Sequence, residues 1–227
     1  MKCKWGAIVV DGRGKLGGHV ASKNRSGAYW RTKVTPSNPQ SVRQLLVRQN
    51  FTGNAQAWRG ITQAQRDAWI SAVTNFTGTD VFGDSMTPSG FNLYVSLNNN
   101  LINVGESAID DPPLPEAVDG FTSFSFVADT TAGTLIATFA PAITANTKVI
   151  LWATPALSAG KKFVKSEYRQ ITVWDNTDTS PAPFSTVYIA KYGALPPVGT
   201  KIFVKLLPIN ITTGQSGAMI DSYDIAV

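Results

Sequence analysis

Cysteine and histidine are nearly absent from this chain of 227 residues, which contains only Cys3 and His19 of these two types. A single cysteine excludes an intramolecular disulfide framework and any metal site that several cysteines would build. No apolar stretch reaches the roughly 18 residues that a membrane-spanning helix needs, and the first residues lack the apolar segment of a secretory signal. We therefore expect a protein made in a cytoplasm, with no partner in a membrane.

Charged residues are also few, at 15% of the chain, whereas 43% of the residues are apolar. Serine, threonine, asparagine and glycine are plentiful, which is typical of proteins rich in strands and loops. The apolar content is ample for a buried core, and the length allows one large domain or two small ones.

The few charges are unevenly distributed along the sequence. Residues 1–70 contain twelve lysines and arginines against Asp11 and Asp67, a net charge of +10, whereas residues 71–227 carry a net charge of −5. Two segments of opposite sign indicate two modules, and the basic one requires an anionic partner or an acidic neighbouring subunit.

The amino-terminal part has the signals of an α+β module. Residues 4–35 are predicted to form three strands, separated by a glycine-rich turn and by the hairpin turn "KNRSG" at 23–27. Three short helices should follow these strands.

Each expected helix has a recognisable start. Asn38, followed by a proline, is predicted to cap the first helix. Thr62 and Gln65 have the spacing of a capping box for the second. The third should begin at Thr87 and end before Gly105, because glycine is favoured just past a helix terminus.

The segment "GESAIDDPPLPEAVDG" contains three prolines and no apolar periodicity, so we interpret residues 106–119 as an extended linker. From residue 120 onward the apolar residues recur with period two, which predicts a β-sandwich of seven strands. The strand candidates are 121–128, 133–141, 147–155, 161–174, 183–192, 200–210 and 218–227.

The end of the chain, "KIFVKLLPINITTGQSGAMI", resembles the penultimate strand, loop and last strand of fibronectin type III domains. The resemblance covers residues 120–227 and implies an all-β immunoglobulin/fibronectin III-like sandwich. That fold has an early tryptophan in its core, and we expect Trp152, in the third strand, to take this packing role.

Gly12, Gly14 and Gly17 have the spacing G-x-G-x-x-G of dinucleotide-binding turns. Such turns need a helix directly after the last glycine and an acidic residue for the ribose, and the sequence that follows offers neither. A P-loop is excluded because Leu16, rather than serine or threonine, follows Lys15. We expect instead a tight loop whose glycines leave room for the backbone of another chain. These close-approach glycines are Gly12, Gly14, Gly17 and Gly18.

The amino-terminal part also resembles a group of viral proteins. The run "GKLGGHVASKNRSGAYWRTKVTPSNPQSVRQLLVRQNF", followed by "WRGITQAQRDAWISAV" and "GFNLYVSLNNNLINVG", is similar to small structural proteins of tailed and related bacteriophages. The shared pattern is a glycine-rich loop, a basic hairpin, an Asn-Pro helix start and a tryptophan-containing helix, and it spans residues 1–105. The resemblance implies a place in the virion rather than a mechanism.

Residues suited to catalysis are missing. A Ser-His-Asp triad would have to use His19, yet the chain has no G-x-S-x-G elbow. Asp110 and Asp111 are adjacent in an extended segment, so their side chains point apart and cannot close a metal site. We therefore expect no enzyme, no cofactor and no metal.

The remaining candidate site is a basic hairpin in which cations flank two aromatic residues, as they do on surfaces that bind phosphates and bases. The alternative is that the cations pair with acidic groups of a neighbouring subunit, since a hairpin alone has little stability. We favour the subunit contact over nucleic acid. The candidate contact residues are Lys15, Lys23, Arg25, Tyr29, Trp30, Arg31 and Lys33.

These observations predict a basic arm with a three-helix anchoring module at 1–105, a linker at 106–119 and a sandwich at 120–227. We expect a non-enzymatic virion structural protein, oligomeric in the particle and made in the host bacterial cytoplasm. Its role would be that of a capsid-decoration or minor capsid protein whose basic module contacts major capsid or tail subunits. One alternative is a receptor- or carbohydrate-binding module of a tail or host-surface protein, using loop 174–183 and Trp174. The other is nucleic-acid binding through the basic hairpin.

Overall fold

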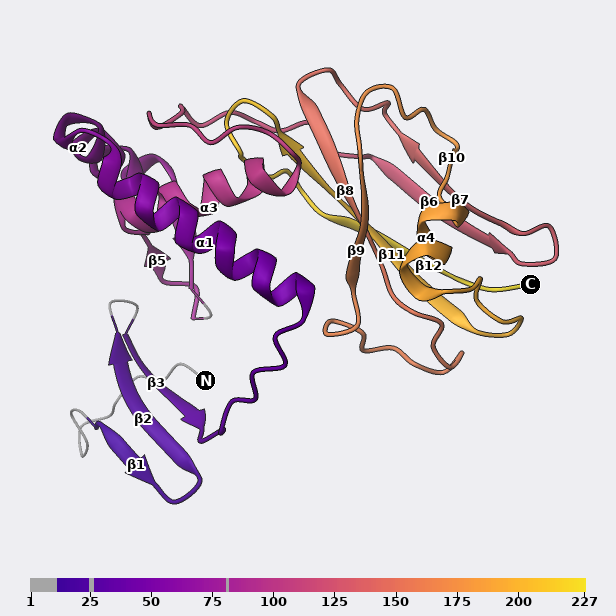
Figure 1. Ribbon diagram of the computed structural model, residues 1–227, viewed down its shortest axis with the longest axis horizontal. Coiled ribbons are helices and arrows are strands. Elements are labelled where there is room, and N and C mark those ends of the chain that lie inside the picture. Colours follow the sequence, from indigo (N-terminus) through magenta and orange to yellow (C-terminus); the bar gives the residue numbers. More distant parts are fainter. Residues whose placement is uncertain (1–11, 25–26, 81) are drawn as a thin grey trace.

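A computed structural model describes residues 12–24, 27–80 and 82–227 of the chain. These residues form four α-helices and several antiparallel sheets, which confirms a mixed α+β class (Figure 1). None of the helices in the described ranges combines the length and apolarity that crossing a bilayer demands. The strand expected before Gly12 lies outside the described residues.

The amino-terminal sheet contains β1 (Gly14–Leu16), β2 (His19–Asn24) and β3 (Gly27–Thr32), in that order. Leu16 pairs with His19, so a two-residue turn joins β1 to β2, and Gly17 in this turn has a φ of 56°. Such left-handed backbone favours glycine. Part of the expected glycine loop is therefore a strand and a tight hairpin turn. In Figure 1 this indigo sheet stands apart from the two larger sheets.

Three helices follow, and their starts test the predicted caps. The helices are α1 (Val42–Gly60), α2 (Gln63–Ala72) and α3 (Gly90–Asn103). Thr62 and Gln65 form the predicted capping box. The predicted start at Asn38 is wrong: Gln40 has a φ of 47°, which no α-helix contains, and the N-cap is Ser41.

The third helix also begins later than predicted, after the N-cap Ser89 rather than at Thr87. Its predicted end is confirmed, because Gly105 has a φ of 80° and the next amide, of Glu106, donates to the carbonyl of Leu101 (2.9 Å). Three short elements connect α2 to α3: the 3₁₀ helix η1 (Val73–Asn75), β4 (Gly78–Thr79) and β5 (Ser85–Met86).

Aromatic rings hold the helices together. Trp69 and Tyr94 are fully buried with ring centroids 5.3 Å apart, and Trp58 packs on Tyr94 at 5.2 Å. Trp69 Nε1 also donates to the carbonyl of Asp110 (2.7 Å), and the buried Asn98 exchanges two hydrogen bonds with the backbone of Ile109. The start of the segment 106–119 is therefore fixed to the helices, although it forms no helix or strand.

Two larger sheets form the carboxyl-terminal part. The first has the order β10-β7-β6, from Ala182–Pro183, Thr134–Ala140 and Ser123–Asp129. The second has the order β12-β11-β8-β9, from Ile220–Ile225, Lys201–Asn210, Thr147–Ala153 and Arg169–Trp174. Alternate residues of both sheets meet in one apolar core, whose fully buried members include Leu135, Ala137, Val149, Leu151, Ile202, Val204 and Leu206.

One predicted strand, 183–192, is wrong. Apart from Pro183 in β10, this segment forms α4 (Ser185–Tyr192), which ends at Gly193 in the left-handed conformation. Phe184 and Tyr188 are four residues apart and are both buried in the common core. This spacing places both residues on one face of a helix. Residues four apart also share one face of a strand, which is why the sequence alone predicted a strand.

The core tryptophan is also not the predicted one. Trp152 alternates with Leu151 and Ala153, which are fully buried, so its side chain lies half-buried on the opposite face of β8. Trp174, at the end of β9, occupies the core instead, with its ring 5.7 Å from Phe139. The expected role of Trp152 is therefore wrong.

The helices pack against the outer face of the second large sheet. Val104, directly after α3, is buried with Ile150 of β8 and Ile209 of β11. Beside it, Lys148 Nζ pairs with Glu106 (2.7 Å). The loop after β11 touches α3 as well, since Asn100 Nδ2 donates to the carbonyl of Gly214 (2.9 Å).

We predict that Gly214→Ala destabilises the chain by at least about 3 kcal/mol, because the added methyl group would overlap the carbonyl oxygen of Leu97 at a φ of 70°. Gly133→Ala is the matched control, with a φ of 73° and open space around the new atom, and should cost only about 1 kcal/mol. Urea unfolding of both variants measures the difference. Equal losses of unfolding free energy in the two variants would mean that the loop around Gly214 does not pack closely against α3.

Candidate functional site

The strand register distributes the predicted contact residues over two faces of the amino-terminal sheet. Lys15, Val20 and Arg31 form one row across the three strands, with Lys15 and Arg31 on either side of Val20. Tyr29, two positions before Arg31, lies on the same face. This basic face is the part of the predicted site that the fold brings together.

Trp30 and Lys23 lie on the opposite face of the sheet, because side chains alternate along a strand. Trp30 pairs with the buried Ala21, and its ring centroid is 6.5 Å from that of His19. Beside them Leu16 is 69% exposed, and a hollow of about 380 Å³ opens between these side chains and the backbone of β1. This face is therefore mainly apolar, with Lys23 as its one predicted cation.

The two other predicted contact residues do not join either face in the same way. Lys33 directly follows β3, and its amide donates a hydrogen bond to the carbonyl of Gly18 (2.8 Å), in the turn between β1 and β2. Arg25 lies outside the described residues. The predicted site is thus a basic face and an apolar face, not a single cluster.

Four cations of the amino-terminal part have no acid beside them among the described residues. The sequence from 12 to 66 contains ten lysines and arginines and no aspartate or glutamate. Within the described ranges, no carboxylate lies at ion-pair distance from Lys15, Lys23, Arg31 or Lys33, and both recorded ion pairs join other residues. The basic face is therefore available to an external anion.

The glycines of this region show no need for close packing within the chain. A Cβ atom placed on Gly14, Gly17 or Gly18 would meet no atom within 4 Å. At Gly14 and Gly17 the positive φ accounts for the residue, whereas at Gly18 the chain itself gives no reason. Approach of another chain to Gly12, Gly14, Gly17 and Gly18 stays a prediction.

Acidic residues gather in the next part of the sequence. Residues 67–147 contain nine aspartates and glutamates and no lysine or arginine. Four of the acids follow Glu106 on the extended segment 106–119, and all four are exposed: Asp110, Asp111, Glu116 and Asp119. The middle of the chain therefore presents an acidic surface.

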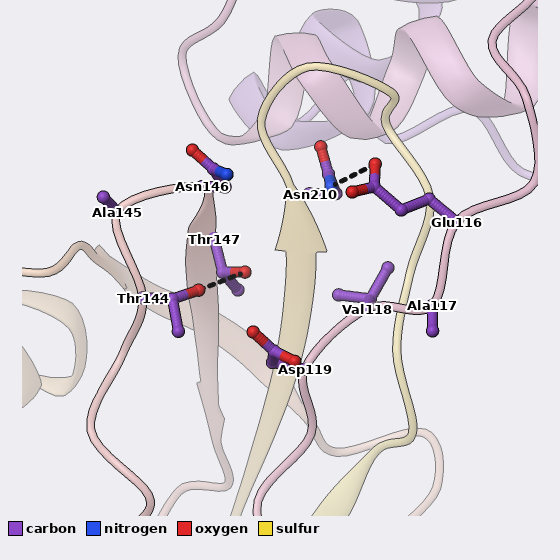
Figure 2. Close-up of a pocket in the computed structure, with 9 residues that line it drawn as sticks. All are labelled: Glu116, Ala117, Val118, Asp119, Thr144, Ala145, Asn146, Thr147 and Asn210. Atoms are coloured by element: carbon purple, nitrogen blue, oxygen red, sulfur yellow. Dashed lines mark hydrogen bonds between the residues drawn. The ribbon is translucent and has the colours of Figure 1, made fainter.

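A small hollow of about 140 Å³ lies at the end of this acidic segment (Figure 2). Glu116 and Asp119 of the acidic segment line it together with Asn146, Thr147 and Asn210. Asn210 Nδ2 donates to Glu116 Oε2 (3.1 Å), so part of the polar lining is already paired. Neither here nor elsewhere in the described ranges do three metal-ligating side chains converge.

Loop 174–183, the candidate for carbohydrate binding, has its aromatic residue Trp174 buried. Trp174 is 5% exposed and packs between Phe139 and Phe184, so it cannot stack on a sugar. A different groove, not predicted from the sequence, lies on the outer face of the second large sheet and is lined by Trp152, Tyr168 and several cations. Its residues come from three distant segments, and no local motif marks them.

Comparison with protein-family models, with curated proteins and with solved structures finds no match to this chain.

We predict that the two faces of the amino-terminal sheet bind acidic partners unequally. Arg31→Ala should weaken binding of a fluorescent polyglutamate about tenfold at low salt, because Arg31 acts together with Lys15 on one face. Lys23→Ala removes the same charge from the opposite face and should change affinity less than twofold. Fluorescence anisotropy measures both variants, and equal losses would contradict a defined binding face.

Proposed function

We propose that this chain is a non-enzymatic structural protein of a bacteriophage virion, anchored by its basic amino-terminal module. The observation that carries the proposal is the separation of charge. A basic sheet, in which Lys15 and Arg31 have no described carboxylate at ion-pair distance, precedes a segment of the opposite sign, and both are exposed. Such a protein gains stability when its basic face meets an acidic subunit, which is the behaviour expected of an assembly component.

The form of the basic sheet supports attachment to another chain. Three short strands with two small buried residues, Ala21 and Ala28, bury little apolar surface of their own. A partner that covers the exposed side chain of Leu16 would add apolar contact. The resemblance of residues 1–105 to phage structural proteins leads us to propose major capsid or tail subunits as the partners.

In the proposed protein, residues 120–227 form an immunoglobulin/fibronectin III-like sandwich that projects from the particle or bridges neighbouring subunits. The two antiparallel sheets that share one core support this fold. The inserted helix α4 is a departure from an all-β pattern. A projecting domain on a basic anchor favours a capsid-decoration or minor capsid role.

Two measurements test the role in the particle. Mass spectrometry of purified virions of the encoding phage should detect peptides of this chain, and their absence would overturn the proposal. A variant that lacks residues 1–35 should be missing from particles, because the anchoring cations are removed. Its carboxyl-terminal part should still unfold in a single cooperative melt, which shows that the loss is not a folding defect.

Nucleic acid is the competing partner of the basic face. In that case the affinity for oligo-dT would exceed the affinity for polyglutamate and would fall steeply with salt. Tyr29 would then contribute by stacking on bases, so Tyr29→Leu would weaken binding of oligo-dT alone. We expect the opposite order of affinities, with polyglutamate bound more tightly.

A further inference from the structure

A groove of about 310 Å³ lies on the outer face of the second large sheet. Two of its lining residues, Trp152 and Gln170, belong to one row of side chains across four strands, in which Trp152 stands between Lys205 and Gln170. Asp221 of β12 ends the row beyond Lys205. The register of the sheet therefore places an aromatic ring at the centre of a polar row.

The helices supply the other walls. Arg43, in the first turn of α1, donates from Nη2 to Oε1 of Gln170 (2.7 Å), although the two residues are 127 positions apart. Lys191, near the end of α4, also lines the groove. The groove exists only because α1 and α4 both reach the same edge of this sheet.

A lysine between two rings fixes the aromatic part. Lys205 Nζ lies 4.1 Å from the ring centroid of Tyr168 and 5.5 Å from that of Trp152. Burial lowers the pKa of Lys205, and burial followed by the charge of Asp221 raises the pKa of Tyr168 to about 12. Tyr168 is therefore a neutral hydroxyl at physiological pH, next to a cation that holds its ring in place.

All charged side chains that line the groove are cations: Arg43, Arg169 and Lys191. The nearby acids are occupied or lie further away, since Glu167 pairs with Lys161 (3.2 Å) and Asp221 lies on the far side of Lys205. A guanidinium has five N–H donors, and the recorded bonds of Arg43 use one nitrogen. The lining thus offers many donors to an acceptor-rich ligand.

We propose that this groove binds a carboxylated sugar unit of an acidic glycan. The cations would bind the carboxylate, and their remaining donors together with the amide of Gln170 would bind hydroxyl groups. The half-buried ring of Trp152 would contact the apolar face of the sugar. The volume of the groove suits a ligand of one or two sugar rings. This proposal is independent of the proposed role in the virion.

Titration calorimetry of the full chain with trigalacturonate tests the site, with the neutral maltotriose as the comparison ligand. Trigalacturonate should bind, and maltotriose should bind at least tenfold more weakly because it lacks carboxylates. Lys191→Ala and Arg43→Ala should each reduce the affinity for trigalacturonate about tenfold. The matched control is Lys201→Ala, since Lys201 also lies over aromatic rings, Phe203 and Tyr223, but outside the groove.

Trp152→Ala should abolish binding, and its thermal melt must match that of the unaltered chain for this result to count. If Trp152→Ala unfolds, the Lys191→Ala and Arg43→Ala variants decide the question. Equal binding of the neutral and acidic sugars, or unchanged affinity in both cation variants, would overturn the proposal. Displacement of trigalacturonate by inorganic phosphate or oligo-dT at lower concentration would also overturn it, in favour of a general anion or nucleic-acid site.

Discussion

The packing of the helices on the second large sheet depends on the burial of Val104. This residue follows α3 and is buried between Ile150 and Ile209, on the outer face of the second large sheet. Because α1 packs on α3 through the rings of Trp58 and Tyr94, fixing the end of α3 also fixes α1. The groove includes the first turn of α1, so its geometry depends on this small apolar contact.

Local signals in the sequence predicted the elements whose structure is decided locally. The capping box at Thr62 and the glycine after α3 are of this kind, because neighbouring residues alone satisfy them. Most strands of the second half were also predicted, because alternation along the chain marks their buried face. The errors arose where tertiary packing selects between two patterns. Phe184 and Tyr188 fit either period in a short segment, and only burial against both sheets makes α4 a helix.

The same distinction explains how much of the sites was predictable. A run of cations without acids is visible in any sequence, so the basic module could be identified directly. The division of its residues between two faces required the register of Val20 with Lys15 and Arg31. The groove required contacts between segments more than a hundred residues apart, as between Arg43 and Gln170, and no periodicity carries that information.

Residues 33–41, between β3 and α1, are neither helix nor strand, and all of them are exposed. Nine residues have a contour length of about 30 Å, which sets the radius within which the basic sheet can meet an acidic surface while α1 stays in place. Within that radius a tether raises the effective concentration of the sheet to about the millimolar range. Even a weak electrostatic contact is strengthened in this way, and the tether lets the sheet meet acidic surfaces at unequal distances from α1.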